Sequence, residues 1–141
     1  MLLEVSNKNE LEPVPNNGET AATKQVIQLS IQELTALMRE ERDLRLLDVR
    51  TDAEWEEGHL PEAKHIELAD VTNRLDELDQ GLPLVIYCRT GRRSNIAASL
   101  LKLQGFATVY NLAGGIIAWR LAGHRVVVPR PRPERRTARA A

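Results

Sequence analysis

The stretch that decides the fold is LVIYCRTGRRS, residues 84–94. Its first five residues are typical of a strand that is buried on both faces of a parallel sheet. Arg89 to Arg93 then form a short loop, and Ser94 is a residue type that favours the N-cap of a helix. The expected apolar face of that helix, at residues 94–104, comprises Ile96, Ala97, Leu100 and Leu101. Gly105 is expected to end the helix.

Apolar runs and helical patterns alternate on both sides of this stretch. The runs at 26–29, 44–49, 63–68 and 107–112 have the length and composition of short strands. Ser30 and Glu33 form a capping box that opens a helix, and VTNRLDELDQ, residues 71–80, predicts a helix closed by Gly81. This alternation predicts an α/β domain with a central, mostly parallel sheet flanked by helices.

The two ends of the chain differ in composition from this middle part. Residues 1–24 contain prolines, asparagines and few apolar side chains, which predicts a flexible leader. Residues 127–141 are rich in proline and arginine and predict a basic, disordered tail. The domain is therefore expected to span residues 25–126, a length that suits one domain with one active site.

The composition restricts the classes of function. The chain is 43% hydrophobic and 28% charged, as in soluble domains, and no apolar run approaches the roughly 18 residues of a membrane span. The N-terminus lacks the pattern of a signal peptide, and the single cysteine favours a reducing compartment, so we expect a cytoplasmic protein. The basic residues 120–141 include no aromatic side chain that could stack on bases. We therefore expect no specific nucleic-acid partner and no membrane partner.

Cys88 ends the predicted strand, at the sheet edge where parallel sheets bind ligands. A free thiol has a pKa of about 8.5, so only a few per cent is thiolate at neutral pH. One arginine about 4 Å away could lower that pKa by at most about three units, and a helix N-terminus acts in the same direction. Arg93 is the best candidate to complete the ring around the sulfur, with Arg89 and Arg92 more exposed.

Each of these features also has a structural interpretation. A lone cysteine is often a small buried hydrophobe, and surface arginines are commonly solvated. An anion site is favoured because residues 89–93 hold three arginines and no acid, within a domain of negative net charge. His59 and His65 are expected to be structural. Because no cluster of His, Cys and carboxylates has the spacing of a metal site, we expect neither a metal nor another cofactor.

Four blocks of the sequence resemble the rhodanese family, and the resemblance covers about residues 25–122. The blocks, in the family's order and spacing, are LLDVRTDAEWEEGHLPEA (46–63), LVIYCRTGRRS (84–94), IAASLLKLQGF (96–106) and VYNLAGGIIAW (109–119). Gly114 and Gly115 in the last block are expected to permit a tight turn near Cys88.

The resemblance implies a single rhodanese-like domain and a thiosulfate sulfurtransferase type of activity. Cys88 would accept sulfane sulfur from a donor such as thiosulfate and pass it, as a persulfide, to cyanide, a thiol or a protein. The substrate-binding residues implied in this way are Arg89, Thr90, Gly91, Arg92, Arg93 and Ser94. The residues with mostly structural roles are Asp48, Arg50, Glu57, Gly58 and His59. The sequence departs from the family at Glu62, where a small residue is usual, and at Glu67, where asparagine or proline is frequent.

Other classes of protein share parts of this pattern. Cysteine phosphatases and arsenate reductases also hold a thiolate in an amide-lined loop, but Arg93 comes one position too early for their loop, and a second cysteine is absent. A persulfide carrier or a protein-interaction module is the other alternative, although modules without activity usually lose the cysteine. The loop CRTGRRS does not specify the sulfur donor.

Overall fold

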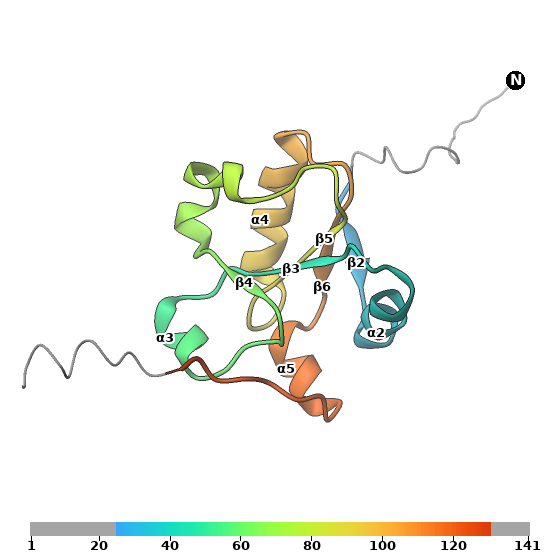
Figure 1. Ribbon diagram of the computed structural model, residues 1–141, viewed down its shortest axis with the longest axis vertical. Helices are drawn as coiled ribbons and strands as arrows, with labels where there is room; N and C mark the ends of the chain where they lie inside the picture. Colours follow the sequence, from blue (N-terminus) through green and yellow to red (C-terminus); the bar gives the residue numbers. More distant parts are fainter. Residues whose placement is uncertain (1–24, 131–141) are drawn as a thin grey trace, which may run out of the picture.

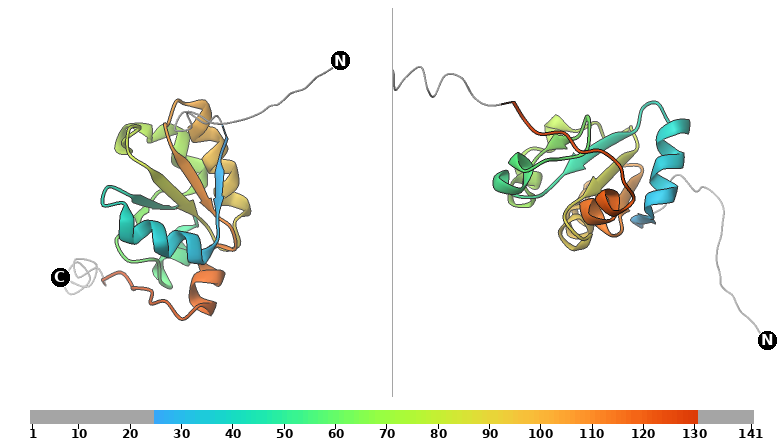
Figure 2. Two further views of the ribbon diagram at one scale, coloured as in Figure 1. Left: turned by 90° about the vertical axis from the view of Figure 1, so that its right-hand side faces the viewer. Right: turned by 90° about the horizontal axis from the view of Figure 1, so that it is seen from below.

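The structure is a computed structural model that describes residues 25–130. The predicted leader, residues 1–24, and residues 131–141 of the predicted tail lie outside the described part. Five parallel strands form one sheet in the order β2-β6-β5-β3-β4, and helices cover both of its faces (Figures 1 and 2). The predicted α/β class with a parallel sheet is confirmed.

The five strands lie where the apolar runs predicted them, but a short helix at residues 52–56 was not predicted. The strands are β2 (Ile27–Leu29), β3 (Arg45–Asp48), β4 (Lys64–His65), β5 (Leu84–Tyr87) and β6 (Val109–Leu112). The α-helices are α2 (Ile31–Glu40), α3 (Asp52–Glu56), α4 (Arg92–Leu103) and α5 (Gly115–Leu121). Two 3-10 helices, η2 (Leu68–Asn73) and η3 (Leu75–Glu77), lie between β4 and β5.

The central strand β5 divides the core into two halves, because its side chains alternate between the faces of the sheet. Ile86 and Cys88 pack against Ala97 and Leu101 of α4. The other half of the core contains Val85 and Tyr87 of β5 together with Leu34 of α2 and Ile116 and Trp119 of α5. All four residues of β5 are buried, which confirms the prediction of a strand covered on both faces.

The helix predicted at residues 71–80 is not an α-helix, and this prediction was wrong. Hydrogen bonds of the 3-10 type, such as Arg74 N–H to Val71 O and Leu78 N–H to Leu75 O, form two short turns instead. Arg74, with φ −129° and ψ 30°, interrupts the turns. The interruption resets the phase, so that Val71, Leu75 and Leu78 all pack on the core.

The helix after Cys88 begins two residues earlier than predicted. Its N-cap is Gly91 with φ 106°, so Ser94 lies inside α4 and not at its N-cap. The buried residues of α4 are Ser94, Ala97, Ala98 and Leu101. Ile96, which was predicted to face the core, is 54% exposed. The polar Ser94 occupies a core position because it contacts Cys88. Hydrophobicity alone therefore did not predict which face of α4 is buried.

Candidate active site

Cys88 directly follows β5 and is buried, with 1% of its surface exposed. The backbone N–H groups of Gly91 and Ser94 donate to its sulfur over 3.1 and 3.3 Å. The hydroxyl of Ser94 lies 3.4 Å from the same sulfur. The amides belong to the N-terminus of α4, which has the geometry of an anion site, so the sulfur occupies the place of the anion.

These donors set the ionisation of Cys88. Burial raises the pKa of the thiol, but hydrogen bonds from the Ser94 hydroxyl and from the amides of Ser94, Gly91 and Thr90 outweigh burial. The pKa of Cys88 therefore lies below its ordinary value. The thiolate is the nucleophilic form of cysteine, so the loop favours reactivity. The amides at the helix N-terminus contribute to the lowering, as the sequence led us to expect, whereas the expected arginine is not among its main causes.

A polar network behind the sulfur was not predicted from the sequence. The Ser94 hydroxyl lies 2.5 Å from Asn111 Oδ1 on β6. The amide nitrogen of Asn111 donates to Gln28 Oε1 over 2.8 Å and to Gly91 O over 3.2 Å. A hydroxyl has a single proton, so Ser94 donates either to Asn111 or to Cys88. Asn111 thus holds both Ser94 and the carbonyl of the residue that caps α4.

Two glycines allow the backbone to pass close to the cysteine loop. A Cβ on Gly115 would lie 2.3 Å from Arg89 O and 2.6 Å from Cys88 O, closer than any side chain tolerates. The first amides of α5 use this approach, since Ile116 N–H donates to Cys88 O and Ile117 N–H donates to Arg89 O. The structure thus places the tight turn at Gly114 and Gly115 beside the loop, as the sequence indicated.

The three arginines of the loop occupy different environments. Arg89 and Arg92 are exposed. Arg93 is half-buried and donates two hydrogen bonds to the carboxylate of Glu54 on α3, over 2.7 and 2.9 Å. The Arg93 pair lowers the pKa of Glu54 to about 2. Arg93 therefore joins the loop to α3 and does not complete the ring of donors around the sulfur.

The segment that precedes α3 is held by a buried ion pair. Arg50 pairs with Asp48 over 2.8 Å and also donates to Gly58 O over 2.7 Å, with both side chains almost fully buried. His59 Nδ1 lies 2.9 Å from Leu60 O, and its ring stacks on Trp55 with 3.4 Å between centroids. These side chains therefore stabilise the segment around α3, and none of them donates to the sulfur of Cys88.

An open pocket of about 530 Å³ lies beside the cysteine loop. Its lining residues are Gln28, Thr90, Gly91, Arg92, Asn95, Ile96, Asn111, Ala113 and Gly114. The loop and the Gln28–Asn111 pair of the network thus share one surface. Within residues 25–130, no helix combines the length and the apolar character needed to cross a bilayer.

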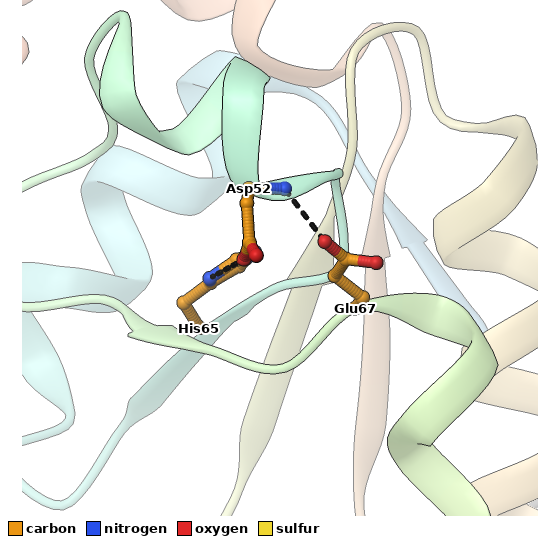
Figure 3. Close-up of side chains that lie close together, drawn as sticks. All are labelled: Asp52, His65 and Glu67. Carbon is orange, nitrogen blue, oxygen red and sulfur yellow. Dashed lines mark hydrogen bonds and ion pairs between the residues drawn. The ribbon is translucent and has the colours of Figure 1, made fainter.

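A second group of polar side chains comes together outside this site. Asp52, His65 and Glu67 lie close to one another (Figure 3), with one ligand atom of each within 4.8 Å of the others. This group was not predicted from the sequence, because its residues follow no ligand-spacing rule and meet only through the pairing of β3 with β4.

A buried cysteine of lowered pKa, which follows a parallel strand and accepts hydrogen bonds from loop amides, is the defining feature of this α/β domain. A family model described as the rhodanese-like domain matches residues 30–122. A sulfurtransferase of Allochromatium vinosum is 36% identical over 74% of this chain and 97% of its own length. A thiosulfate sulfurtransferase of Coxiella burnetii is 34% identical over 69% of this chain and 87% of its own length.

The solved structures agree with this result. A rhodanese-like domain protein from Staphylococcus aureus has a TM-score of 0.67 at 26% identity, over 74% of this chain and all of its own length. The chain therefore belongs to the rhodanese-like family, as its four sequence blocks suggested. The sulfurtransferases among its relatives support a transferase that moves sulfur.

Proposed function

We propose that this protein transfers sulfane sulfur from a small anionic donor, such as thiosulfate, to a thiophilic acceptor. The observation that carries the proposal is the cradle around Cys88 Sγ, in which two backbone amides and one hydroxyl contact a sulfur of lowered pKa. The same donors that favour a thiolate also suit the terminal sulfur of a persulfide, which carries a negative charge.

The reaction has two nucleophilic displacements. The Cys88 thiolate attacks the outer sulfur of thiosulfate, a sulfur–sulfur bond forms, and sulfite leaves with the electron pair of the bond that breaks. The acceptor, which is cyanide, a thiol or a protein nucleophile, then attacks the outer sulfur of the persulfide. Cys88 leaves as the thiolate, so no metal, redox cofactor or general base is required for the cycle.

The other loop residues support these steps in the proposal. Arg89 and Arg92 are exposed and attract the donor dianion, whose capture then weakens as salt screens the charges. The amides of Thr90, Gly91 and Ser94, which donate to Cys88 Sγ, would also stabilise the transferred sulfur, while Arg93 fixes the loop on α3 through Glu54. The first step needs Cys88 as a free thiolate, a form that a reducing compartment favours.

The surface beside the cysteine loop favours a protein as the sulfur acceptor. Ile96 is 54% exposed and lines the pocket beside the loop, where an apolar contact with a partner would lie close to the persulfide. A carrier of this kind would load sulfur from the donor and release it slowly to cyanide.

A sulfur-transfer assay tests the proposal. Thiosulfate and cyanide should yield thiocyanate at a rate that depends on enzyme concentration, and Cys88→Ser should abolish that turnover while it keeps the melting temperature. Sustained turnover by Cys88→Ser would overturn the covalent mechanism. Persulfide formation without thiocyanate turnover would identify a carrier instead of a cyanide-accepting enzyme.

A further inference from the structure

Asp52, His65 and Glu67 meet outside the cysteine site (Figure 3). Asp52 is the first residue of α3, His65 is the last residue of β4, and Glu67 precedes η2. His65 Nδ1 lies 3.7 Å from Asp52 Oδ1, which is too long for a hydrogen bond. The backbone N–H of Asp52 donates to Glu67 Oε2 over 2.7 Å. This hydrogen bond keeps Glu67 beside the other two side chains.

The ring of His65 is fixed by contacts on its far side. His65 Nε2 lies 2.7 Å from Arg50 O, and a carbonyl oxygen only accepts, so Nε2 carries the proton of this hydrogen bond. The ring also stacks on Trp55, with 4.7 Å between centroids and 10° between planes. Nδ1 is therefore directed at the carboxylates, and in the neutral ring it presents a lone pair.

A lone pair and a carboxylate that face each other repel unless a positive charge lies between them. In the described part of the chain, no N–H or O–H group donates to either His65 Nδ1 or Asp52 Oδ1. Either a proton on Nδ1 or a bound cation can supply the positive charge. A second ring nitrogen that donates to a backbone carbonyl is the usual support of a histidine that ligates a metal.

We propose that Asp52, His65 and Glu67 bind a divalent transition-metal ion of the zinc type, through His65 Nδ1 and one oxygen from each carboxylate. One imidazole with two carboxylates suits Zn²⁺, Ni²⁺, Co²⁺ or Cu²⁺ better than Mg²⁺ or Ca²⁺. Ligands of a tetrahedral zinc ion lie about 3.4 Å apart, so the 3.7 Å pair needs little movement. The Asp52 side chain is 85% exposed, which leaves it free to close on the ion and leaves water access to a fourth position.

The site has a structural link to the cysteine loop. Asp52 begins the helix that carries Glu54, and Glu54 holds Arg93 of the loop. A metal that joins α3 to the end of β4 would therefore restrict the helix on which the loop rests. The binding itself does not depend on sulfur transfer, so the site can be present whether or not Cys88 carries sulfur.

Titration of the reduced, tag-free full-length chain with Zn²⁺, followed by calorimetry, tests the proposal. We expect one ion per chain, with the same affinity in Cys88→Ser, in which the thiol cannot act as the ligand. His65→Gln, Asp52→Asn and Glu67→Gln should each weaken binding by at least about 10-fold, because even the loss of a residue that only supports a metal ligand costs about 10–100-fold. His124→Gln and Glu56→Gln are the controls and should bind as the wild type does.

Tryptophan fluorescence gives a second measurement at the same site. Ni²⁺ held by His65 should quench Trp55, and in Asp52→Asn, whose exposed position puts the fold at no risk, this quenching should need at least about 10-fold more Ni²⁺. Absence of Zn²⁺ binding at millimolar concentration would overturn the proposal. Unchanged affinity in both Asp52→Asn and His65→Gln would also overturn it, since the ion would then lie elsewhere.

Discussion

Ser94 is the residue that most directly couples the fold to the reactivity of Cys88. Its hydroxyl makes the largest of the contributions that lower the pKa of the thiol when its single proton is donated to the sulfur and not to Asn111 Oδ1. Ser94→Ala should therefore raise the pKa of Cys88, because the thiolate loses a hydrogen bond that favours the charged form.

The rate of Cys88 alkylation as a function of pH measures this change. The rate of Ser94→Ala should rise at higher pH than that of the wild type, because less thiolate is present at neutral pH. Ser99→Ala, on the exposed side of the same helix, is the control. If both variants have the wild-type profile, the hydroxyl does not stabilise the thiolate.

Glu62 is the described non-glycine residue with a positive φ, at 67°. This explains the small residue that the family usually has there. A left-handed conformation costs a residue with a side chain about 1–2 kcal/mol. Replacement by glycine removes this strain, but the larger entropy that glycine loses on folding offsets about 0.5–1 kcal/mol of the gain.

Glu62→Gly should therefore raise the free energy of unfolding in urea, by up to about 1 kcal/mol. Glu57→Gly, at φ −77°, should lower it by about 0.5–1 kcal/mol, because only the entropic cost remains there. A loss of stability in both variants would show that the left-handed turn places no strain on Glu62.

The contact between α5 and the cysteine loop depends on the absence of a side chain at Gly115. A methyl group there would meet the backbone of Arg89 at 2.3 Å, whereas a methyl group on Gly123 would have no atom within 4 Å. Both glycines have positive φ, at 58° and 87°. The two substitutions to alanine therefore share backbone strain and differ in the clash.

Gly123→Ala should cost about 1–2 kcal/mol of stability, and Gly115→Ala should cost about 1–3 kcal/mol more, because the loop must move. Gly115→Ala should also slow alkylation of Cys88, while Gly123→Ala should not. Urea unfolding and thiol reactivity measure the two effects. Equal losses in both variants would mean that α5 does not shape the loop.

The pair between Glu54 and Arg93 makes the junction of α3 and α4 sensitive to acid. Glu54 has a pKa of about 2 in the folded protein, against about 4.3 for an unfolded chain. A lowered pKa means that the stabilisation is fully present above about pH 4.3 and is lost as the pH falls towards 2. Both side chains are partly exposed, so the contribution is at most about 1 kcal/mol.

Glu54→Gln should therefore be less stable than the wild type at pH 7, and the two should converge as the pH falls through this range. Glutamine keeps an oxygen that can accept from the Thr51 amide, so the helix cap is retained. Glu56→Gln, exposed on the same helix, should show little difference at any pH. A stability gap for Glu54→Gln that persists at pH 2 would exclude the ion pair as its cause.

Part of the site could be predicted from the sequence because it is contiguous. Cys88, the loop and Gly91 lie within one stretch, and their chemistry follows from residue type. Asn111 and Glu54 could not be predicted, since Asn111 contacts Ser94 across 17 residues and Glu54 contacts Arg93 across 39. The sheet order brings them together, and polar residues at such distances give no periodic signal.

The fold was easier to predict than the site, because apolar runs that alternate with helical patterns indicate an α/β sheet. The strands and their parallel pairing followed from buried runs, and the capping box of Ser30 and Glu33 is present as predicted. The error at residues 71–80 arose because 3-10 and α-helical turns bury similar patterns of leucine and valine. The two types of helix differ in their backbone hydrogen bonds, and the spacing of apolar residues in so short a segment does not distinguish them.

The end of the domain gives a prediction for the whole molecule. His59 and Val127 exchange two backbone hydrogen bonds of 2.8 Å, one residue beyond the expected boundary at 126. A chain of residues 25–130 should have the same melting temperature as the full-length protein. A chain of residues 25–126 should melt several degrees lower, since each hydrogen bond contributes about 1 kcal/mol. Equal melting of the two shortened chains would show that the bridge contributes nothing.

The central claim is that Cys88 carries the transferred sulfur. Intact mass spectrometry of the full-length protein after incubation with thiosulfate tests it most directly. The proposal predicts one added sulfur atom per chain, its loss on treatment with a reductant or cyanide, and no addition to Cys88→Ser. A wild-type mass that stays unchanged with thiosulfate and with other sulfane sulfur donors, or an equal addition to Cys88→Ser, would contradict the proposal.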